Sequence, residues 1–464
     1  MFVGFPKQFA LFAAAAALGV GSAWADPTLP TIASDPAHTF TVPAATGTST
    51  TDTTNLRNAI SAAAAAGGGT VKVAAGTYLS NVLTLSSGIN LNLAAGANIQ
   101  DATPGAALIK TSGSGLHDIE ISGAGSIDGR ATATSSNHLV DLQNINRLLV
   151  TGVKIQNSGN FHLVVENMTN MTIDGININD NFTVQQHGDY LSNTDAIDYS
   201  GQHILIKNST INSGDDDIVA KPSGTFVGDV TITNDTIGHG HGISIGGQTQ
   251  AGMDGLNVNH ITFNGTDNGL RLKSGAAAIQ SSGGGGVVKN ISFSDITMTN
   301  VRYPIIINSW YNAGDHYGSK ELSPTSLHDP AQFNVANPGD PTVNVDQLNN
   351  GSDEFPFWDN ISYANITATG GLGEVALIYG LNSLRARPTD PLRNIDGVSF
   401  NNVSLSGAYG ADIYYVSGLD LSGLTVNATS GNDINQFGDS VPEPSCIALV
   451  GTVAFFATRR RLRH

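Results

Sequence analysis

A repeat of short, strand-like segments constrains this sequence more than any other feature. Segments with apolar residues at alternate positions, each followed by a turn rich in Asn, Ser and Asp, recur between residues 149 and 405. Equivalent residues such as Ile211, Ile237 and Phe263 lie about 26 residues apart, within the period range of stacked solenoid coils. One coil buries its apolar side only against its neighbours. The repeat therefore predicts an all-β chain folded as a single-stranded, right-handed parallel β-helix.

The composition agrees with short strands and tight turns, and it also limits the possible partners. Gly accounts for 54 of the 464 residues, and the net charge is -17. That charge argues against a nucleic-acid or anionic-membrane partner, because basic surfaces supply the affinity in those complexes. The single cysteine, Cys446, excludes an intrachain disulfide and a cysteine-rich metal site. We expect no cofactor, no metal and a monomer.

The first 25 residues predict a secretory signal peptide. Lys7 gives a short positive region, residues 10–20 are apolar, and Ala23-Trp24-Ala25 fits cleavage before Asp26. A membrane anchor is the weaker alternative, because the apolar run falls short of about 20 residues. The sequence therefore predicts an exported protein.

Residues 26–440 are expected to form one β-helix body behind a short lead-in. Residues 26–52 are rich in Pro, Thr and Ala and predict a linker or an edge strand. The body, 53–440, should begin with a short capping helix, because Thr53 or Thr54 can serve as the N-cap of a run with apolar residues on one face. Residues 311–357 interrupt the repeat and predict a long insert loop at the binding groove.

Asn-x-Ser/Thr triplets, such as those at Asn167 and Asn290, recur at the predicted turns. They could be glycosylation acceptors. Asn also tolerates left-handed backbone in tight turns and can stack from one coil to the next. We therefore favour a structural role for them.

Four polar clusters between residues 193 and 273 are the candidate active site. They are Asn193-Thr194-Asp195, Gly214-Asp215-Asp216-Asp217, Gly240-His241-Gly242 and Arg271-Leu272-Lys273. Glycoside hydrolysis needs one carboxyl group that holds a proton for the leaving oxygen and another that stays ionised to activate water. Carboxylates placed close together produce that division, because like charges raise one pKa.

The basic pair in the last cluster suggests an acidic substrate. Arg271 and Lys273 are two residues apart, so on a strand both side chains project from one face. Arginine binds a carboxylate bidentately and lysine adds a point charge. A sugar that carries a carboxylate explains such a pair in an acidic protein.

In this order and spacing, the four clusters resemble glycoside hydrolase family 28, the polygalacturonases and their relatives. The Gly-rich segment 121–129 and Lys221, which follows the double aspartate, add to the resemblance. It implies cleavage of α-1,4-galacturonosidic bonds in pectin with inversion at the anomeric carbon. Gly214, where Gln stands in other members, leans toward exo-acting or branched-pectin enzymes.

The resemblance also implies roles for eight residues. The catalytic ones are Asp195, Asp215, Asp216 and His241, and the substrate-binding ones are Asn193, Arg271, Lys273 and Tyr303. Asp215 would be the general acid, with His241 beside it, and Asp195 and Asp216 would activate water. Asn193 would support Asp195 by hydrogen bonding, and Tyr303 would be the active-site tyrosine. The third carboxylate, Asp217, leaves open a register in which the pair is Asp216 and Asp217.

The last residues, 441–464, form a separate pattern. Val441-Pro442-Glu443-Pro444 is followed by an apolar run at 446–457 and by Arg459-Arg460-Arg461. A run of about a dozen apolar residues is too short to span a bilayer comfortably. The pattern resembles the PEP-CTERM sorting tail of Gram-negative bacteria. It implies an exosortase-type protease as a partner, and an extracellular, cell-surface or exopolysaccharide location.

Three other functions remain open at this point. A rhamnogalacturonan or xylogalacturonan hydrolase would use the same fold and the same carboxylates. A polysaccharide lyase would need a calcium site and an Arg or Lys base. A noncatalytic surface β-helix would use none of the polar clusters for chemistry.

Overall fold

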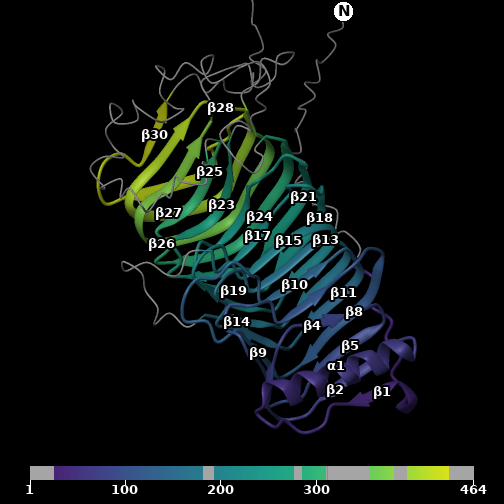
Figure 1. Ribbon diagram of the computed structural model, residues 1–464. Helices are drawn as coiled ribbons and strands as arrows, with labels where there is room; N and C mark the ends of the chain where they lie inside the picture. The colour runs from purple at the N-terminus through teal and green to yellow at the C-terminus, as the bar shows by residue number, and fades with distance from the viewer. Residues whose placement is uncertain are drawn as a thin grey trace, which may run out of the picture.

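The computed structural model describes residues 26–180, 193–275, 285–309, 311, 356–380 and 394–437. These residues form an elongated stack of coils that runs from the N-terminal end, in purple, to the C-terminal end, in yellow (Figure 1). Neighbouring strands pair in parallel from one coil to the next, which confirms the predicted all-β parallel solenoid. The predicted signal peptide, the sorting tail and nearly all of the insert loop lie outside the described residues.

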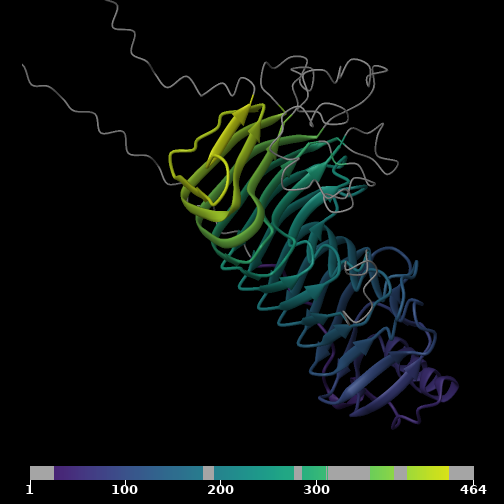
Figure 2. The same ribbon diagram turned by 90° about the vertical axis from the view of Figure 1, so that its left-hand side faces the viewer.

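Each coil contributes strands to three stacks that run the length of the molecule (Figure 2). Long strands bend at the corners and belong to two or three stacks. The first stack contains β1 (Thr39–Thr41), β2 (Gly69–Val73), β5 (Ile89–Leu93), β8 (Leu116–Gly123), β11 (Ile145–Thr151), β13 (Leu163–Asp174), β15 (Ile197–Lys207), β18 (Val227–Thr233), β21 (Met253–Asn259), β24 (Val287–Thr299), β26 (Phe357–Tyr379), β27 (Ile395–Tyr414) and β28 (Val416–Ser417).

The second and third stacks complete the coil. The second contains β3 (Gly76–Ser80), β6 (Ala97–Asp101), β9 (Ser126–Asp128), β12 (Lys154–Gln156), β14 (Asn177–Asn179), β16 (Thr210–Ser213), β19 (Thr236–His239), β22 (Thr262–Asn264), parts of β24, β26 and β27, and β29 (Leu424–Ala428). The third contains β4 (Leu83–Leu85), β7 (Ile109–Thr111), β10 (Val140–Gln143), the first parts of β13 and β15, β17 (Ile218–Ala220), β20 (Ile243–Gly247), β23 (Asn268–Ser274), β25 (Tyr303–Asn308), the last parts of β26 and β27, and β30 (Ile434–Phe437).

The core lies inside the coils, where apolar residues stack in register. Ile211 pairs with Ile237, and Ile237 pairs with Phe263, so the 26-residue spacing read from the sequence is the spacing of stacked positions. All three side chains are fully buried. Each such burial contributes roughly 1.5–3 kcal/mol, so the column stabilises the coils together.

The corners of the coils often place Asn or Gly in left-handed backbone. Asn167 and Asn290 have φ of 56° and 57°, respectively, which L-residues other than Asn, Asp and His rarely adopt. The Asn167 amide donates to Asn144 Oδ1 at 2.7 Å, and the Asn290 amide donates to Asp254 Oδ1 at 2.6 Å, each in an earlier coil. The predicted structural role is confirmed for these two triplets.

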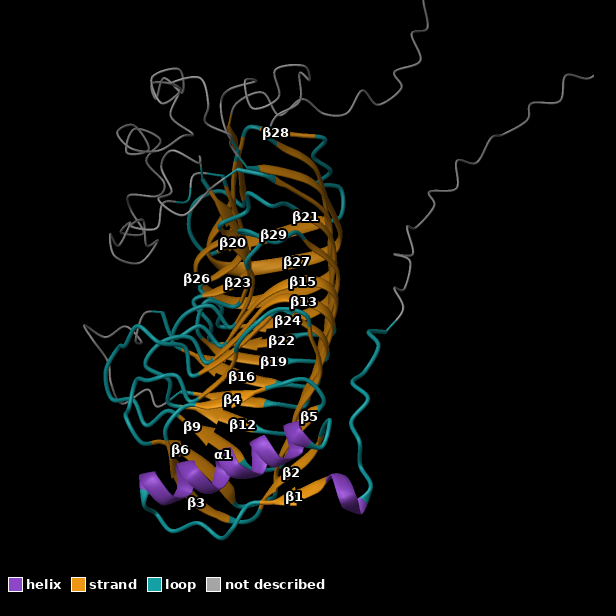
Figure 3. Ribbon diagram, turned by 45° about the vertical axis from the view of Figure 1, so that its right-hand side comes forward, coloured by secondary structure: helices purple, strands orange, loops and turns teal. Residues whose placement is uncertain are grey.

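One helix, α1 (Ser49–Ala65), lies against the first strands at the N-terminal end of the solenoid, after the short 3-10 helix η1 (Pro36–His38) (Figure 3). The predicted start near residue 53 was wrong, because Thr48 is the N-cap residue. Asp52 accounts for the difference. Its buried carboxylate accepts the backbone N–H groups of Thr46, Gly47 and Leu79, which ties the first helical turn to the preceding loop and to β3. No helix in the described part of the chain is long and apolar enough to cross a bilayer.

One corner position carries a charge inside the fold. Asp235 occupies the position that Ile261 has in the next coil, because Thr236 and Thr262 make the same backbone bond one coil apart. Its Oδ1 accepts the Ser209 N–H at 2.6 Å, whereas its buried Oδ2 has no hydrogen-bond partner among the described residues. Burial raises the pKa of Asp235 to about 7.

We expect Asp235→Asn to stabilise the protein above pH 7, by about 4 kcal/mol. Because the folded-state pKa is raised, the wild type loses stability as pH rises from 3.8 to about 7 and stays penalised above that. The variant lacks this loss, so the two proteins should match near pH 4. Thermal unfolding from pH 4 to 9 measures the difference. The exposed corner residue Asp295, as Asp295→Asn, is the control and should show no such divergence.

Candidate functional site

The predicted clusters meet on the outer face of the third stack. Ile197, Ile218, Ile243 and Leu270 are in register on successive coils and point into the core. Because side chains alternate along a strand, their neighbours Ser244 and Arg271 point outward. The polar residues just before β15, β17 and β20 lie at the same edge of this stack.

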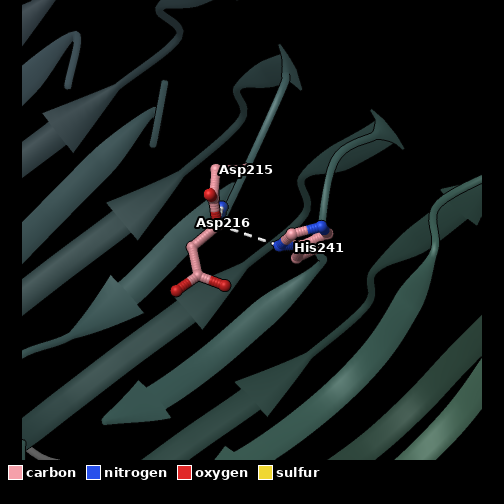
Figure 4. A group of neighbouring side chains, drawn as sticks. All are labelled: Asp215, Asp216 and His241. Atoms are coloured by element: carbon pink, nitrogen blue, oxygen red, sulfur yellow. Dashed lines mark hydrogen bonds and ion pairs between the residues drawn. The ribbon is translucent and has the colours of Figure 1, made fainter. Parts of the chain in front are cut away.

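Asp215 and His241 form a hydrogen-bonded pair at this edge. His241 Nδ1 lies 2.9 Å from Asp215 Oδ1, and Figure 4 shows the imidazole beside the Asp215–Asp216 pair. Asp215 Oδ2 accepts the backbone N–H of Asn193 at 2.9 Å, so Asn193 contacts Asp215, and its predicted hydrogen bond to Asp195 stays a prediction. Burial raises the pKa of Asp215, but the charge and hydrogen bond of His241 outweigh burial and hold that pKa below its usual value.

Asp216 is the centre of a charged network. It is almost fully buried, and its carboxylate accepts bonds from Arg271, from Lys273 Nζ at 2.8 Å and from Ser244 Oγ at 2.9 Å. Burial alone would raise its pKa, but Arg271 and Lys273 hold the pKa well below its usual value. Asp216 is therefore ionised. Both predicted carboxylate-binding residues already contact a carboxylate of the protein.

Asp195 belongs to a second group of charges, which Lys221 connects to the Asp216 network. Lys221 Nζ lies 3.4 Å from Asp195 Oδ2, 3.5 Å from Asp198 Oδ2 and 3.9 Å from Asp216 Oδ2. Burial and the nearby Asp198 raise the pKa of Asp195 well above its usual value. Burial likewise raises the pKa of Asp198 to about 7, although Lys221 opposes the rise. Asp195 thus has a high proton affinity beside the ionised Asp216.

Asp217 contacts the backbone and Ser213 instead of these charges. Its carboxylate accepts the Gly242 N–H at 2.9 Å and the Ser213 hydroxyl at 3.0 Å. Burial raises its pKa well above the usual value. This geometry favours the register in which the working pair is Asp215 and Asp216.

Tyr303 lies one coil beyond Asp267, whose backbone N–H donates to the Gly240 carbonyl next to His241. It pairs in register with Asn268 and packs in an aromatic and aliphatic cluster with Ile306, Leu377, Tyr379, Tyr414 and Tyr415. The Arg302 guanidinium lies 5.1 Å from its ring centroid. Among the described contacts, none joins Tyr303 to the carboxylates, so its predicted role stays a prediction.

Two residues of the site were not predicted. Asp198 lies in β15, three residues after Asp195. This Asp-x-x-Asp spacing is the sequence feature that could have identified it. Ser244 donates to Asp216 and accepts from Arg271 Nε at 3.2 Å. Nothing in its local sequence marks Ser244, because its role depends on its register with Arg271.

Asp215, Asp216 and His241 also offer three ligand atoms within 4.8 Å of one another. The residues around them do not fit a bound metal cation, because both oxygens of Asp216 already face cations. The arrangement suits proton transfer instead. Asp215 is hydrogen-bonded to His241. Beside this pair lie the ionised Asp216 and Asp195, whose pKa is raised.

Comparison with known sequences gives a family and several relatives. The family model described as glycosyl hydrolases family 28 matches residues 37–336. A polygalacturonase of Medicago sativa is 29% identical over 270 residues, which cover 56% of this chain and 50% of the relative. An endo-polygalacturonase of Pectobacterium carotovorum subsp. carotovorum is 29% identical over 290 residues, 53% of this chain and 69% of the relative. The chain spans about half the length of the first curated relatives it matches.

Comparison with solved structures supports the fold. The family 28 exopolygalacturonase of Yersinia enterocolitica superposes with a TM-score of 0.64 at 17% identity. The match covers 87% of this chain and 79% of that one. At this identity the likeness shows that the two chains share a fold.

Proposed function

We propose that this chain, which belongs to family 28 of the glycosyl hydrolases, cleaves α-1,4-galacturonosidic bonds of pectin or polygalacturonate by inverting hydrolysis. One observation carries the proposal. The Asp215–His241 pair, the ionised Asp216 and the high-affinity Asp195 converge at one edge of the third stack, beside Arg271. Relatives named as polygalacturonases support the same substrate.

In the proposed reaction, water attacks the anomeric carbon while the bond from that carbon to the leaving oxygen breaks. Asp216, which stays ionised, orients the water. Asp195 accepts the water proton, because its raised pKa gives it the greater proton affinity. Asp215 gives a proton to the leaving oxygen.

The acid must gain its proton when the substrate is bound, because His241 holds the pKa of Asp215 low in the free site. Exclusion of water and the arrival of a substrate carboxylate both raise that pKa. Asp215 and His241 share a hydrogen bond of 2.9 Å through which a proton can move. Asp215 therefore suits a general acid that becomes protonated only when the substrate is bound.

Arg271 and Lys273 are proposed to bind the galacturonate carboxylate. In the free site they contact Asp216, so the substrate carboxylate would share these cations with it. Arginine has donors for two carboxylates at once, because its guanidinium carries five N–H groups. Lys273 also lies 5.0 Å from the ring centroid of Tyr311, where a sugar could contact both.

The product anomer and the product sizes test this function. We expect NMR of early polygalacturonate digests to show the β-anomer at newly formed reducing ends. Release of monomer or dimer from the start would indicate exo action, and a ladder of sizes would indicate endo action. Unsaturated products that absorb in the ultraviolet would instead indicate a lyase. Cleavage of rhamnogalacturonan or xylogalacturonan alone would keep the fold and mechanism but change the substrate.

Further proposals concern export and architecture. Residues 1–25 would direct export, and an exosortase-type protease would remove the 441–464 tail at the cell surface. The intact mass of the exported protein tests both cleavages. We also propose that the coil is right-handed, that α1 caps it and that the protein is a monomer. An experimental structure and light scattering test these three points.

A further inference from the structure

We propose that Lys221 and Asp198 are positioning residues that set the proton affinity of Asp195 in opposite directions. This inference rests on the proposed function, in which Asp195 accepts the proton of the attacking water. Asp198 favours the protonated form of Asp195, and Lys221 favours the ionised form. Together they set the pH range in which Asp195 loses its proton and becomes able to accept one from the attacking water.

The position of Lys221 supports its part. It follows β17 directly, and its backbone N–H donates to the Tyr199 carbonyl at 2.8 Å, which fixes the start of the side chain. From there the ammonium group reaches three carboxylates, at 3.4, 3.5 and 3.9 Å. A lysine already within reach of Asp195, Asp198 and Asp216 holds the two proposed water-binding carboxylates at one point.

The surroundings of Asp198 support its part. Asp198 is 2% exposed and is in register with Val164 in one neighbouring coil and Val219 in the other. Its Oδ1 has no hydrogen-bond partner among the described residues. A buried carboxylate flanked by valines is costly unless it is paired or protonated. Lys221 can pair with the Asp198 carboxylate, and Asp195 can share a proton with it. Asp198 and Asp195 therefore compete for one cation and can share one proton.

Other charged groups near Asp195 act on both variants alike. Asp215 and Asp216 lie on the substrate side, and each raises the pKa of Asp195. On the opposite side, His162 Nδ1 lies 3.2 Å from the Asp195 carbonyl, and Asp180 lies 3.6 Å from His162. Glu166 lies within the electrostatic reach of Lys221. These groups keep their identity in both variants. Lys221→Met also removes a positive charge 3.9 Å from Asp216 Oδ2, so the direction of the shift relative to Asp198→Asn is the informative result.

The test compares the pH dependence of kcat in Asp198→Asn and Lys221→Met. The acidic limb of the profile reports ionisation of the base in the complex. We expect the limb to move to lower pH by about one unit in Asp198→Asn and to higher pH by about one unit or more in Lys221→Met. KM should change less than about threefold in both, because neither residue is assigned to the substrate. Lys221→Arg should return the limb toward the wild-type position.

Matched controls and a second readout keep the test decisive. Lys207→Met and Asp174→Asn disrupt an ion pair of 3.6 Å at a corner of the coil and should leave the limb unchanged. Infrared titration without substrate follows the protonated carboxyl groups of Asp195 and Asp198. In the wild type, one carboxyl band should disappear as pH rises through neutrality, and in Asp198→Asn that band should be absent. Shifts in the same direction, or no shift in folded variants, would overturn the inference. If the wild type does not cleave uronic polymers, the proposed function is overturned instead. The infrared titration would then still test whether Asp195 and Asp198 share a proton.

Discussion

We expect Asp215→Asn to lower kcat on polygalacturonate by about 10²–10⁴-fold, with KM within a few-fold of the wild type. The amide keeps the shape of the carboxyl group and can still face His241, but it has no acidic proton for the leaving oxygen. Because leaving-group protonation is needed only in the transition state, the loss should fall on kcat. Initial rates on polygalacturonate, measured with variant protein of unchanged thermal stability, provide the result.

Asp217→Asn is the matched comparison, two residues away in the same run. Asp217 accepts from Gly242 and Ser213 and faces no cation of the network. The two Asp217 oxygens accept the backbone N–H groups of Gly242 and Ser213, so in either orientation the amide nitrogen of Asn would meet an N–H group. We therefore expect lower stability but a kcat of the folded protein within a few-fold of the wild type. Loss of kcat in Asp217→Asn, with activity kept in Asp215→Asn, would move the acid–base pair to Asp216 and Asp217.

Much of the fold follows from local features of the sequence. Alternating apolar residues and Asn turns act within a few residues, and their spacing from Ile211 to Phe263 is the true register of the coils. The clusters at Asp195, Asp215 and His241 converge for the same reason. Each precedes a strand of the same stack by a similar number of residues, so stacking the strands brings the clusters together.

The remaining features depend on contacts between distant residues. The start of α1 is set by the contacts of Asp52 with Thr46 and Leu79, not by the helix sequence. The pairing of Arg271 with Asp216 joins residues 55 positions apart. Arg271 and Lys273 on one face of a strand predict a carboxylate partner. Only the pairing of β17, β20 and β23 shows that in the free site this partner is Asp216 of the protein itself.

We expect Arg271→Met to destabilise the protein by about 3 kcal/mol near neutral pH. Asp216 is almost fully buried and ionised, so removal of one cation leaves part of its charge uncompensated. Lys273 and Lys221 remain near it, which places the cost at the lower end of the range for broken buried ion pairs. Denaturant unfolding at constant ionic strength measures the loss.

The pH dependence of this loss identifies its cause. The pKa of Asp216 lies well below its usual 3.8 in the folded protein, so its ion pairs stabilise the fold fully above that value. This stabilisation disappears as pH falls toward the folded-state pKa and Asp216 becomes protonated. The difference between wild type and Arg271→Met should therefore be constant above about pH 5 and shrink steadily below about pH 4. A difference that stays constant at low pH would indicate lost packing of the arginine side chain instead.

Two further variants separate the buried network from ordinary surface pairs. Lys289→Met breaks an exposed ion pair of 3.1 Å with Asp254 and should cost less than about 1 kcal/mol. The double variant Arg271→Met with Asp216→Asn should be more stable than Arg271→Met alone, because the amide needs no cation. A double variant no more stable than the single one would show that the arginine does not stabilise the fold through Asp216. Because stability reports this pair without substrate, the result stands whichever polymer the enzyme cleaves.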